Sequence, residues 1–238
     1  MSLIFFDFET TGLDIHAKSN PDKIIQFMFL NATSQEYYGS FVNPQKEILP
    51  KVVSLTGLTN DDVVLYKTID KYIPLIVEFI GKTEPVFLVG HNCDSFDKIL
   101  LLNELKNCNI DIPANWYFID TLKLARNLLP NLENYKLDTL RGHFNISTTN
   151  SHLATKDVLD LEQIYKKIAN DKTPSQMYDL SKQFSQIMSF GKHKGKHFKD
   201  IPEGYFAILF HSGYLSETQN VDLYTNLRAF YGSKKKLR

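Results

Sequence analysis

The order in which strand-like and helix-like segments follow one another most constrains the fold of this chain. Three segments rich in aromatic and β-branched residues come first, at residues 2–8, 24–30 and 35–42, and turn-forming residues separate them. This pattern predicts an antiparallel meander. From residue 85 onward, short apolar runs lead through turns into helical patterns. Because strand–turn–helix units build parallel strands, we expect an α/β fold whose mixed sheet is flanked by helices.

Apolar residues recur at helical spacing in several stretches of the first 170 residues. The predicted helices cover residues 68–81, about 95–107, the segment after Asp120, and residues 151–169. Thr59 or Asn60 is expected to cap the helical part that contains the first of these, and Ser151 the last.

The composition changes near residues 170–175, where Asn, Asp, Lys, Thr, Pro and Ser replace the apolar pattern. We therefore expect a main domain over residues 1–170, a linker over 171–189 and a small, mainly helical accessory domain over 190–238. The chain has no net charge, but residues 171–238 hold 11 lysines and arginines against 6 acidic residues, a balance of +5 that leaves −5 for residues 1–170. An acidic body with a basic extension suits a metal-dependent enzyme on nucleic acid, although a segment charge of this size is ordinary.

The two cysteines, Cys93 and Cys108, have neither metal-ligand spacing nor a disulfide framework around them. This usage suits a reducing compartment. The N-terminus lacks the basic start and apolar run of a signal peptide, and the apolar stretches are too short to span a membrane. We therefore expect a cytoplasmic protein without a membrane partner.

Two carboxylates interrupt the first apolar segment, IFFDFETTGLD. Strand side chains alternate between faces, so Asp7 and Glu9 share one face and Phe6 and Phe8 the other. An exposed strand end or a basic partner would account for a lone pair of this kind, because unpaired buried charges cost on the order of several kcal/mol each. The other explanation is that both carboxylates converge on cations.

Two further segments, GHNCDSFD at 90–97 and HLATKD at 152–157, place polar residues near helix starts. Asp97 alone could simply favour the helix dipole, and His152 and Asp157 alone could be solvated helix residues. Together with the first strand, the three segments resemble the DnaQ-like 3′ to 5′ exonucleases of the RNase H-like fold, in the subgroup defined by Asp, Glu, Asp, Asp and a histidine. Connecting segments such as FIDTLKLAR and KLDTLRGHFNI are also similar, and the resemblance covers about residues 2–169.

This resemblance implies a two-metal mechanism. Two Mg²⁺ or Mn²⁺ ions would be held by Asp7, Glu9, Asp97 and Asp157, with Asp7 bridging. His152 would be the general base that takes the proton of the attacking water. Lys156 departs from the family pattern at a place that is often acidic, which changes the local charge but removes no metal ligand.

Several substrate contacts follow from the same resemblance. The loop of Thr10, Thr11, Gly12 and Leu13 would bind the terminal nucleotide through backbone groups and an apolar wedge, with a plain glycine turn as the alternative. A second set, for which helix capping and core packing are equal alternatives, would touch the terminal sugar or base: His91, Asn92 and Phe96. Asp120 is expected to be a helix N-cap and not a metal ligand.

The segment FGKHKGKHFKD resembles the start of a small domain appended to some exonucleases, including those similar to exodeoxyribonuclease X. Its lysines, Lys192, Lys194 and Lys196, could grip phosphates without reading sequence. The aromatic residues that follow at 198–214 are expected to form the core of a small helical unit, and the terminal KKKLR a solvated tail.

The sequence thus predicts a metal-dependent 3′ to 5′ exonuclease that acts on DNA 3′ ends, preferably single-stranded. A polymerase or repair protein is a candidate partner. Three alternatives stay open: RNA as the substrate, a proofreading subunit whose C-terminal part docks a polymerase, and a catalytically silent nucleic-acid-binding protein. The intact set of carboxylates argues against the last, because a binding module has no use for four converging carboxylates.

Overall fold

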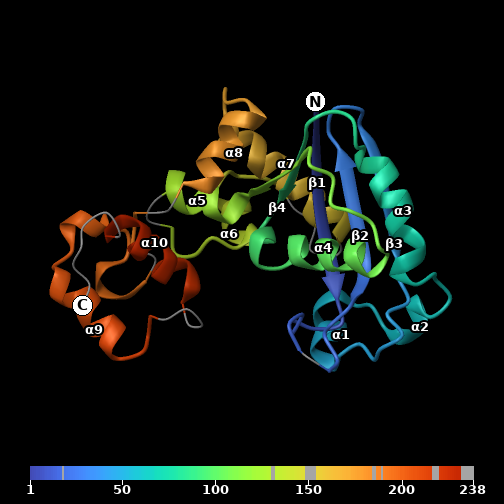
Figure 1. Cartoon of the computed structure of the whole chain (residues 1–238), viewed down its shortest axis with the longest axis horizontal. Coiled ribbons are helices and arrows are strands. Elements are labelled where there is room, and N and C mark those ends of the chain that lie inside the picture. Colours follow the sequence, from blue (N-terminus) through green and yellow to red (C-terminus); the bar gives the residue numbers. More distant parts are fainter. Residues whose placement is uncertain are drawn as a thin grey trace.

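The computed structural model of the chain (Figure 1) describes residues 1–17, 19–129, 132–147, 154–183, 186–188, 190–215 and 220–231. His152 and Ser151, and the terminal KKKLR, lie outside the described residues.

A five-stranded sheet forms the centre of the main part, in the order β3-β2-β1-β4-β5. β1 and β2 pair antiparallel, as do β2 and β3, whereas β1 with β4 and β4 with β5 pair parallel. The predicted meander and parallel strands are therefore confirmed. The strands are β1 (Ser2–Thr10), β2 (Ile24–Asn31), β3 (Glu36–Phe41), β4 (Val86–Gly90) and β5 (Trp116–Asp120).

Helices cover both faces of the sheet. One face packs against α3 (Ile69–Ile80) and α4 (Asp97–Asn107), and alternate β1 residues Ile4, Phe6 and Phe8 are buried there. The opposite face takes Phe5 of β1 and packs against α5 (Thr121–Leu128), α6 (Leu137–His143), α7 (Ala154–Ala169) and α8 (Pro174–Lys182). The short helices α1 (Pro50–Thr56) and α2 (Asn60–Val63) follow β3, and Thr59 caps α2 as expected.

Residues 174–182 correct part of the predicted linker. They form α8, which packs against β5 and α5 and buries Met177 in the core of that face. The polar residues that suggested a linker form the start of this helix. Thr173 accepts a hydrogen bond from the Gln176 N–H, and the Gln176 side chain accepts one from the Thr173 N–H. Pro174 occupies the first turn.

A second core lies in the C-terminal part, where Phe198, Phe206 and Leu227 are fully buried. Its helices, shown in orange and red in Figure 1, lie apart from the sheet on the side of α5 and α6. The aromatic residues of this segment thus contribute mainly to a small core, as the sequence predicts. The elements are the 3₁₀ turns η2 (Gly191–His193) and η3 (Phe198–Asp200) and the helices α9 (Glu203–His211) and α10 (Val221–Tyr231).

Cys93 is buried, Cys108 is partly buried, and neither forms a disulfide. Within the described segments, no helix combines the length and the apolar character needed to cross a bilayer.

Candidate active site

Three carboxylates converge where β1 meets the start of α7. Asp7 and Glu9 lie on the face of β1 that carries Phe5, whose ring packs edge-on against Tyr165 of α7 with 5.4 Å between ring centroids. Asp157 lies in the first turn of α7. One oxygen from each of the three carboxylates lies within 4.8 Å of the others. The structure therefore brings together residues that are up to 150 positions apart in the sequence.

A buried glutamine fixes where α7 begins. Gln26 of β2 lies opposite Glu9 in the antiparallel register, so both side chains are on the same face. Its Oε1 accepts a hydrogen bond of 3.1 Å from the N–H of Ala154, the first residue of α7. This bond satisfies one of the free N–H groups of the helix start and holds Asp157 above β1. The sequence reasoning missed Gln26, although it is the one polar residue within the apolar run IIQFMFL.

Asp97 reaches the same strand from the opposite face of the sheet. It is the first residue of α4, is 5% exposed, and its Oδ1 accepts a 3.2 Å hydrogen bond from the N–H of Phe8. The parallel pairing of β1 with β4 runs only from Ser2 to Phe5, so the edge of β1 near Phe8 extends beyond β4. Asp97 is not one of the three residues whose oxygens converge, but its charge acts on both Asp7 and Glu9.

The carboxylates raise one another's affinity for protons. Burial, and then the charges of Asp97, Glu9 and Asp157, holds the pKa of Asp7 well above its usual range. Burial and the other carboxylates raise the pKa of Glu9 to about 8, and burial raises that of Asp97 to about 7. Among the described residues, no lysine or arginine forms an ion pair with Asp7 or Glu9. Three converging carboxylate oxygens fit a hard divalent cation, which prefers oxygen ligands.

Lys156 does not neutralise this cluster. Its ammonium lies 3.6 Å from Asp160, one turn along α7, and Arg141 of α6 binds the same carboxylate at 2.6 Å. The charge of Lys156 therefore belongs to a neighbouring ion-pair network with Asp160 and Arg141.

The loop after β1 is held in shape by Asp22. The hydroxyl of Thr11 donates to Asp22 Oδ1 at 2.8 Å, and Lys46 pairs with the same oxygen at 2.7 Å. A Cβ atom on Gly12 would lie 2.4 Å from Asp22 Oδ2, so a larger residue there would displace the Asp22 carboxylate. The Thr10 hydroxyl donates to the carbonyl of Gly12, while the side chain of Leu13 is 80% exposed. The sequence does not single out Asp22, whose role depends on contacts 8 to 24 residues away.

The residues after β4 have structural partners. His91 Nδ1 is 3.0 Å from the hydroxyl of Thr121, and burial lowers the pKa of this histidine to about 4, so it is neutral. The N–H of Asn92 donates to Asp120, which also accepts from the Leu122 N–H and so caps α5, as expected. Phe96 packs against the core under α4. The structure thus supports the capping and packing roles that the sequence left open, and the predicted substrate contacts of these residues stay predictions.

The three lysines of the C-terminal segment are exposed and do not belong to the carboxylate cluster. Lys192 lies over the ring of Tyr205 at 5.2 Å, and Lys194 contacts the carbonyl of Glu133 in the segment between α5 and α6. Lys196 is exposed on the same loop.

Known proteins resemble this chain in sequence and in fold. The model of the exonuclease (RNase T) family matches residues 4–165. Exonuclease DPD1 of Arabidopsis thaliana, described as chloroplastic/mitochondrial, is 30% identical over 188 residues, 72% of this chain and 57% of the plant protein. DNA polymerase III subunit epsilon of Aquifex aeolicus is 27% identical over 172 residues, 71% of this chain and 81% of that protein. A structure of exonuclease X in complex with 5′-overhanging duplex DNA has a TM-score of 0.57 at 22% identity, over 75% of this chain and 99% of that one.

A mixed five-stranded sheet flanked by helices, with carboxylates gathered at the end of its first strand, is an RNase H-like architecture. Within that class, the chain belongs to the exonuclease (RNase T) family. The family depends on divalent metal ions. The chain spans little more than half of the plant relative.

Proposed function

We propose that this protein is a metal-dependent 3′ to 5′ exonuclease that removes nucleotides from DNA, preferably from single-stranded ends. The observation that carries the proposal is the convergence of Asp7, Glu9 and Asp157 at the end of β1, in a chain of the exonuclease family. A half-buried cluster of carboxylates is costly for the fold, and such a cost is expected of a site that works with a cation.

Asp7, Glu9, Asp97 and Asp157 would hold the ions, and Mg²⁺ or Mn²⁺ are the candidates because both favour oxygen ligands. Bound there, such cations would lower the pKa of an attacking water and offset the charge on the scissile phosphate. The carboxylate of Asp97 is held in place, because it accepts a hydrogen bond from the N–H of Phe8, the residue between Asp7 and Glu9 in β1.

His152 is proposed as the general base. In the sequence it stands two residues before α7 and five before Asp157. The ordinary histidine pKa, about 6.5, suits proton removal near neutral pH.

The loop of Thr10 to Leu13 would seat the terminal nucleotide. Asp22 holds the backbone of this loop, so its shape is set before the substrate arrives. The exposed side chain of Leu13 is free to contact a base, and His91, Asn92 and Phe96 line the adjacent turn as weaker candidates. Lys192, Lys194 and Lys196 would contact phosphates farther along the strand.

A polymerase partner is a second candidate, favoured by the similarity to DNA polymerase III subunit epsilon over 81% of that protein. In that case the protein would proofread, and the C-terminal segment would bind the polymerase. Sedimentation of the protein with a replicative polymerase from the same cell would distinguish this candidate from a free exonuclease.

The proposal is tested with a 5′-labelled strand offered as single-stranded DNA, as one strand of a duplex and as RNA. With Mg²⁺ or Mn²⁺ we expect a ladder of progressively shorter labelled DNA, fastest on the single strand, and none with EDTA. His152→Ala should slow the ladder about 10²-fold or more, the range for loss of a general base. An intact 5′-labelled strand in both metals would remove the proposal, and faster loss of RNA would change its substrate.

A further inference from the structure

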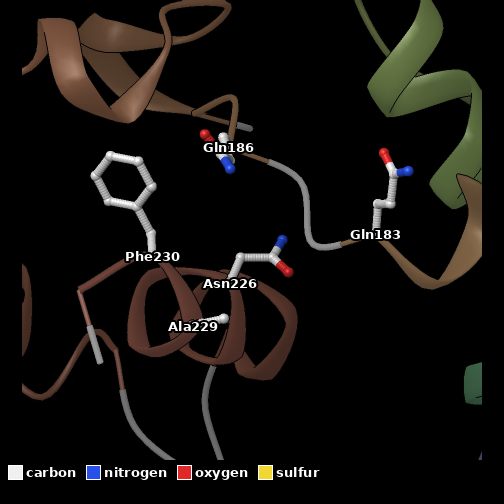
Figure 2. A pocket seen from close by; sticks show the side chains of 5 residues that line it. All are labelled: Gln183, Gln186, Asn226, Ala229 and Phe230. Atoms are coloured by element: carbon white, nitrogen blue, oxygen red, sulfur yellow. The ribbon is translucent and has the colours of Figure 1, made fainter. Parts of the chain in front are cut away.

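A pocket of about 360 Å³ lies where the end of α8 meets the C-terminal unit. Figure 2 shows Asn226 and Ala229 of α10 on one side, Gln186 opposite them, Phe230 at one end and Gln183 at the other. These five residues line the pocket. The site is separate from the carboxylate cluster, because none of its residues belongs to β1, α4 or α7.

The lining combines carboxamides with one aromatic ring. Each of Gln183, Gln186 and Asn226 offers an NH₂ donor beside a carbonyl acceptor, and none of the five lining residues is charged. Paired donors and acceptors match the edges of nucleobases, and an aromatic ring offers a stacking surface. Phe230 is held by edge-on contacts with Phe198 and Tyr231, with ring centroids 5.6 and 4.9 Å away, so its ring is already fixed. The chemistry of the pocket therefore fits a neutral, flat, hydrogen-bonding group.

Three lysines gather around Asp94, and one of them, Lys182, directly precedes the pocket residue Gln183. Lys98, Lys123 and Lys182 surround Asp94 at 3.1, 2.9 and 3.5 Å. Their side chains are 30%, 34% and 37% exposed, so each ammonium can also reach a ligand in solvent.

Asp94 and Lys123 follow β4 and β5, the two strands that come after β1 in the order of the sheet, and α5, which begins after β5, leads toward the pocket. β1, β4 and β5 are parallel neighbours, so residues that follow them lie at one edge: Asp7 and Glu9 at the end of β1, Asp94 after β4, and Lys123 after β5. The side chain of Asn127, one turn beyond Lys123 on α5, donates to the carbonyl of Gln183 at 3.4 Å. Lys182 immediately precedes Gln183. The lysine cluster is thus linked to the pocket through Lys182 and through the bond from Asn127 to Gln183.

We propose that this pocket binds an unpaired nucleobase of the substrate strand, several nucleotides to the 5′ side of the terminal one, with the three lysines holding the intervening phosphates. The inference rests on the proposed function, because it assumes a nucleic-acid strand in the active site. Phe230 would stack on the base, and Asn226 and Gln186 would contact its edge. The site would favour single-stranded over duplex substrates, since a paired base cannot enter it.

The test is fluorescence anisotropy with a 5′-fluorescein oligodeoxyadenylate of about 16 nucleotides, a length at the upper end of known single-strand site sizes. EDTA keeps the strand intact. Phe230→Leu, which keeps apolar volume but removes the ring, should weaken binding about tenfold, within the range for one base stacked on an aromatic ring. Asn226→Leu should weaken it as well, whereas Thr225→Ala, at the neighbouring exposed position of α10, should not. Circular dichroism and melting temperatures of each variant establish that it is folded.

A second probe set places one abasic site at each position of the same strand in turn. For the wild-type protein, we expect one or two internal positions at which the abasic site weakens binding, and no such positions in Phe230→Leu. Hydrolysis of a trinucleotide with Mn²⁺ should be unchanged in Phe230→Leu, because so short a strand does not extend to the pocket. Wild-type affinity in both pocket variants, with a flat abasic scan, would overturn the inference; absent trinucleotide hydrolysis in the wild type would instead count against the proposed function.

Discussion

Asp7 and Glu9 occupy positions of a core strand where hydrocarbon would be more stable, and the consequence is visible in their protonation. Burial and mutual repulsion raise the pKa of Glu9 to about 8 and, together with the charges nearby, that of Asp7 well above its usual range. Acidic residues on a strand that had no function in this place would be expected to face solvent. Here, the pairing of β1 with β2 and the hydrogen bond from the Phe8 N–H to Asp97 hold the strand end in place.

The metal-free protein should lose stability as the pH rises. Between the ordinary glutamate pKa of 4.5 and the value of about 8 in the folded state, the folded protein binds more protons than the unfolded chain. The free energy of unfolding therefore falls across this window, by at most about 1.4 kcal/mol per pH unit for each such group. Thermal unfolding in EDTA at pH 5 and pH 8 measures the effect.

In Glu9→Gln, the same measurement should give a shallower fall, because one titrating group is gone. Mg²⁺ added to the wild type should raise the melting temperature most at pH 8. If the melting temperature in EDTA falls equally from pH 5 to pH 8 in the wild type and in Glu9→Gln, the raised pKa of Glu9 is contradicted.

At the scale of elements, the start of α7 decides whether the site forms. The helix is amphipathic and packs on β1 and β2, and its first residue, Ala154, is buried. The hydrogen bond from the Ala154 N–H to Gln26 sets the register that puts Asp157 within 4.8 Å of Asp7 and Glu9.

Gln26→Leu should therefore impair the site more than the fold. Loss of the buried acceptor leaves an unsatisfied N–H and costs about 1–3 kcal/mol of unfolding free energy. We expect a larger proportional loss of turnover, because Asp157 would shift relative to β1. Urea unfolding and single-strand hydrolysis are compared with those of Gln163→Leu, at an exposed position of α7. Equal turnover in both variants would contradict this role for Gln26.

Elements of this protein differ in how far the sequence reveals them. The strands and the helices α3, α4 and α5 follow from local periodicity and turn residues, and the N-cap role of Asp120 from its place between a strand and a helix. α8 was missed because its polar start has the composition of a linker, although Thr173, Pro174 and Gln176 form a capping motif. Gln26 and Asp22 were missed because their partners are distant in the sequence, so only the assembled sheet defines their roles.

At the scale of the whole molecule, the structure shows where the acidic and the basic residues noted in the sequence lie. The acidic cluster lies at the end of β1, whereas the exposed lysines of the segment 191–199 belong to the C-terminal unit. Between them lie α5 and α8, with Lys123 and Lys182 around Asp94. A strand with its end among the carboxylates would therefore meet positive charge along its length.

Replacement of Lys192, Lys194 and Lys196 by glutamine should weaken single-strand binding mainly at low salt. The slope of log affinity against log salt is negative, and each lost phosphate contact makes it shallower by about 0.7 for a single strand. Anisotropy at several KCl concentrations measures this slope. The matched control replaces Lys67, Lys167 and Lys172, which are exposed on the main part of the chain. An unchanged slope in the first triple variant would exclude these lysines from the interface.

The central claim is that the acidic cluster holds the catalytic cations, and Mn²⁺ binding tests it most directly. Free Mn²⁺ is counted by electron paramagnetic resonance while the same samples are assayed for hydrolysis of a single-stranded DNA. We predict that Asp7→Asn loses Mn²⁺ binding and hydrolysis together and keeps its fold, whereas Asp111→Asn, an exposed carboxylate outside the cluster, keeps both. Wild-type Mn²⁺ affinity in Asp7→Asn would contradict the account.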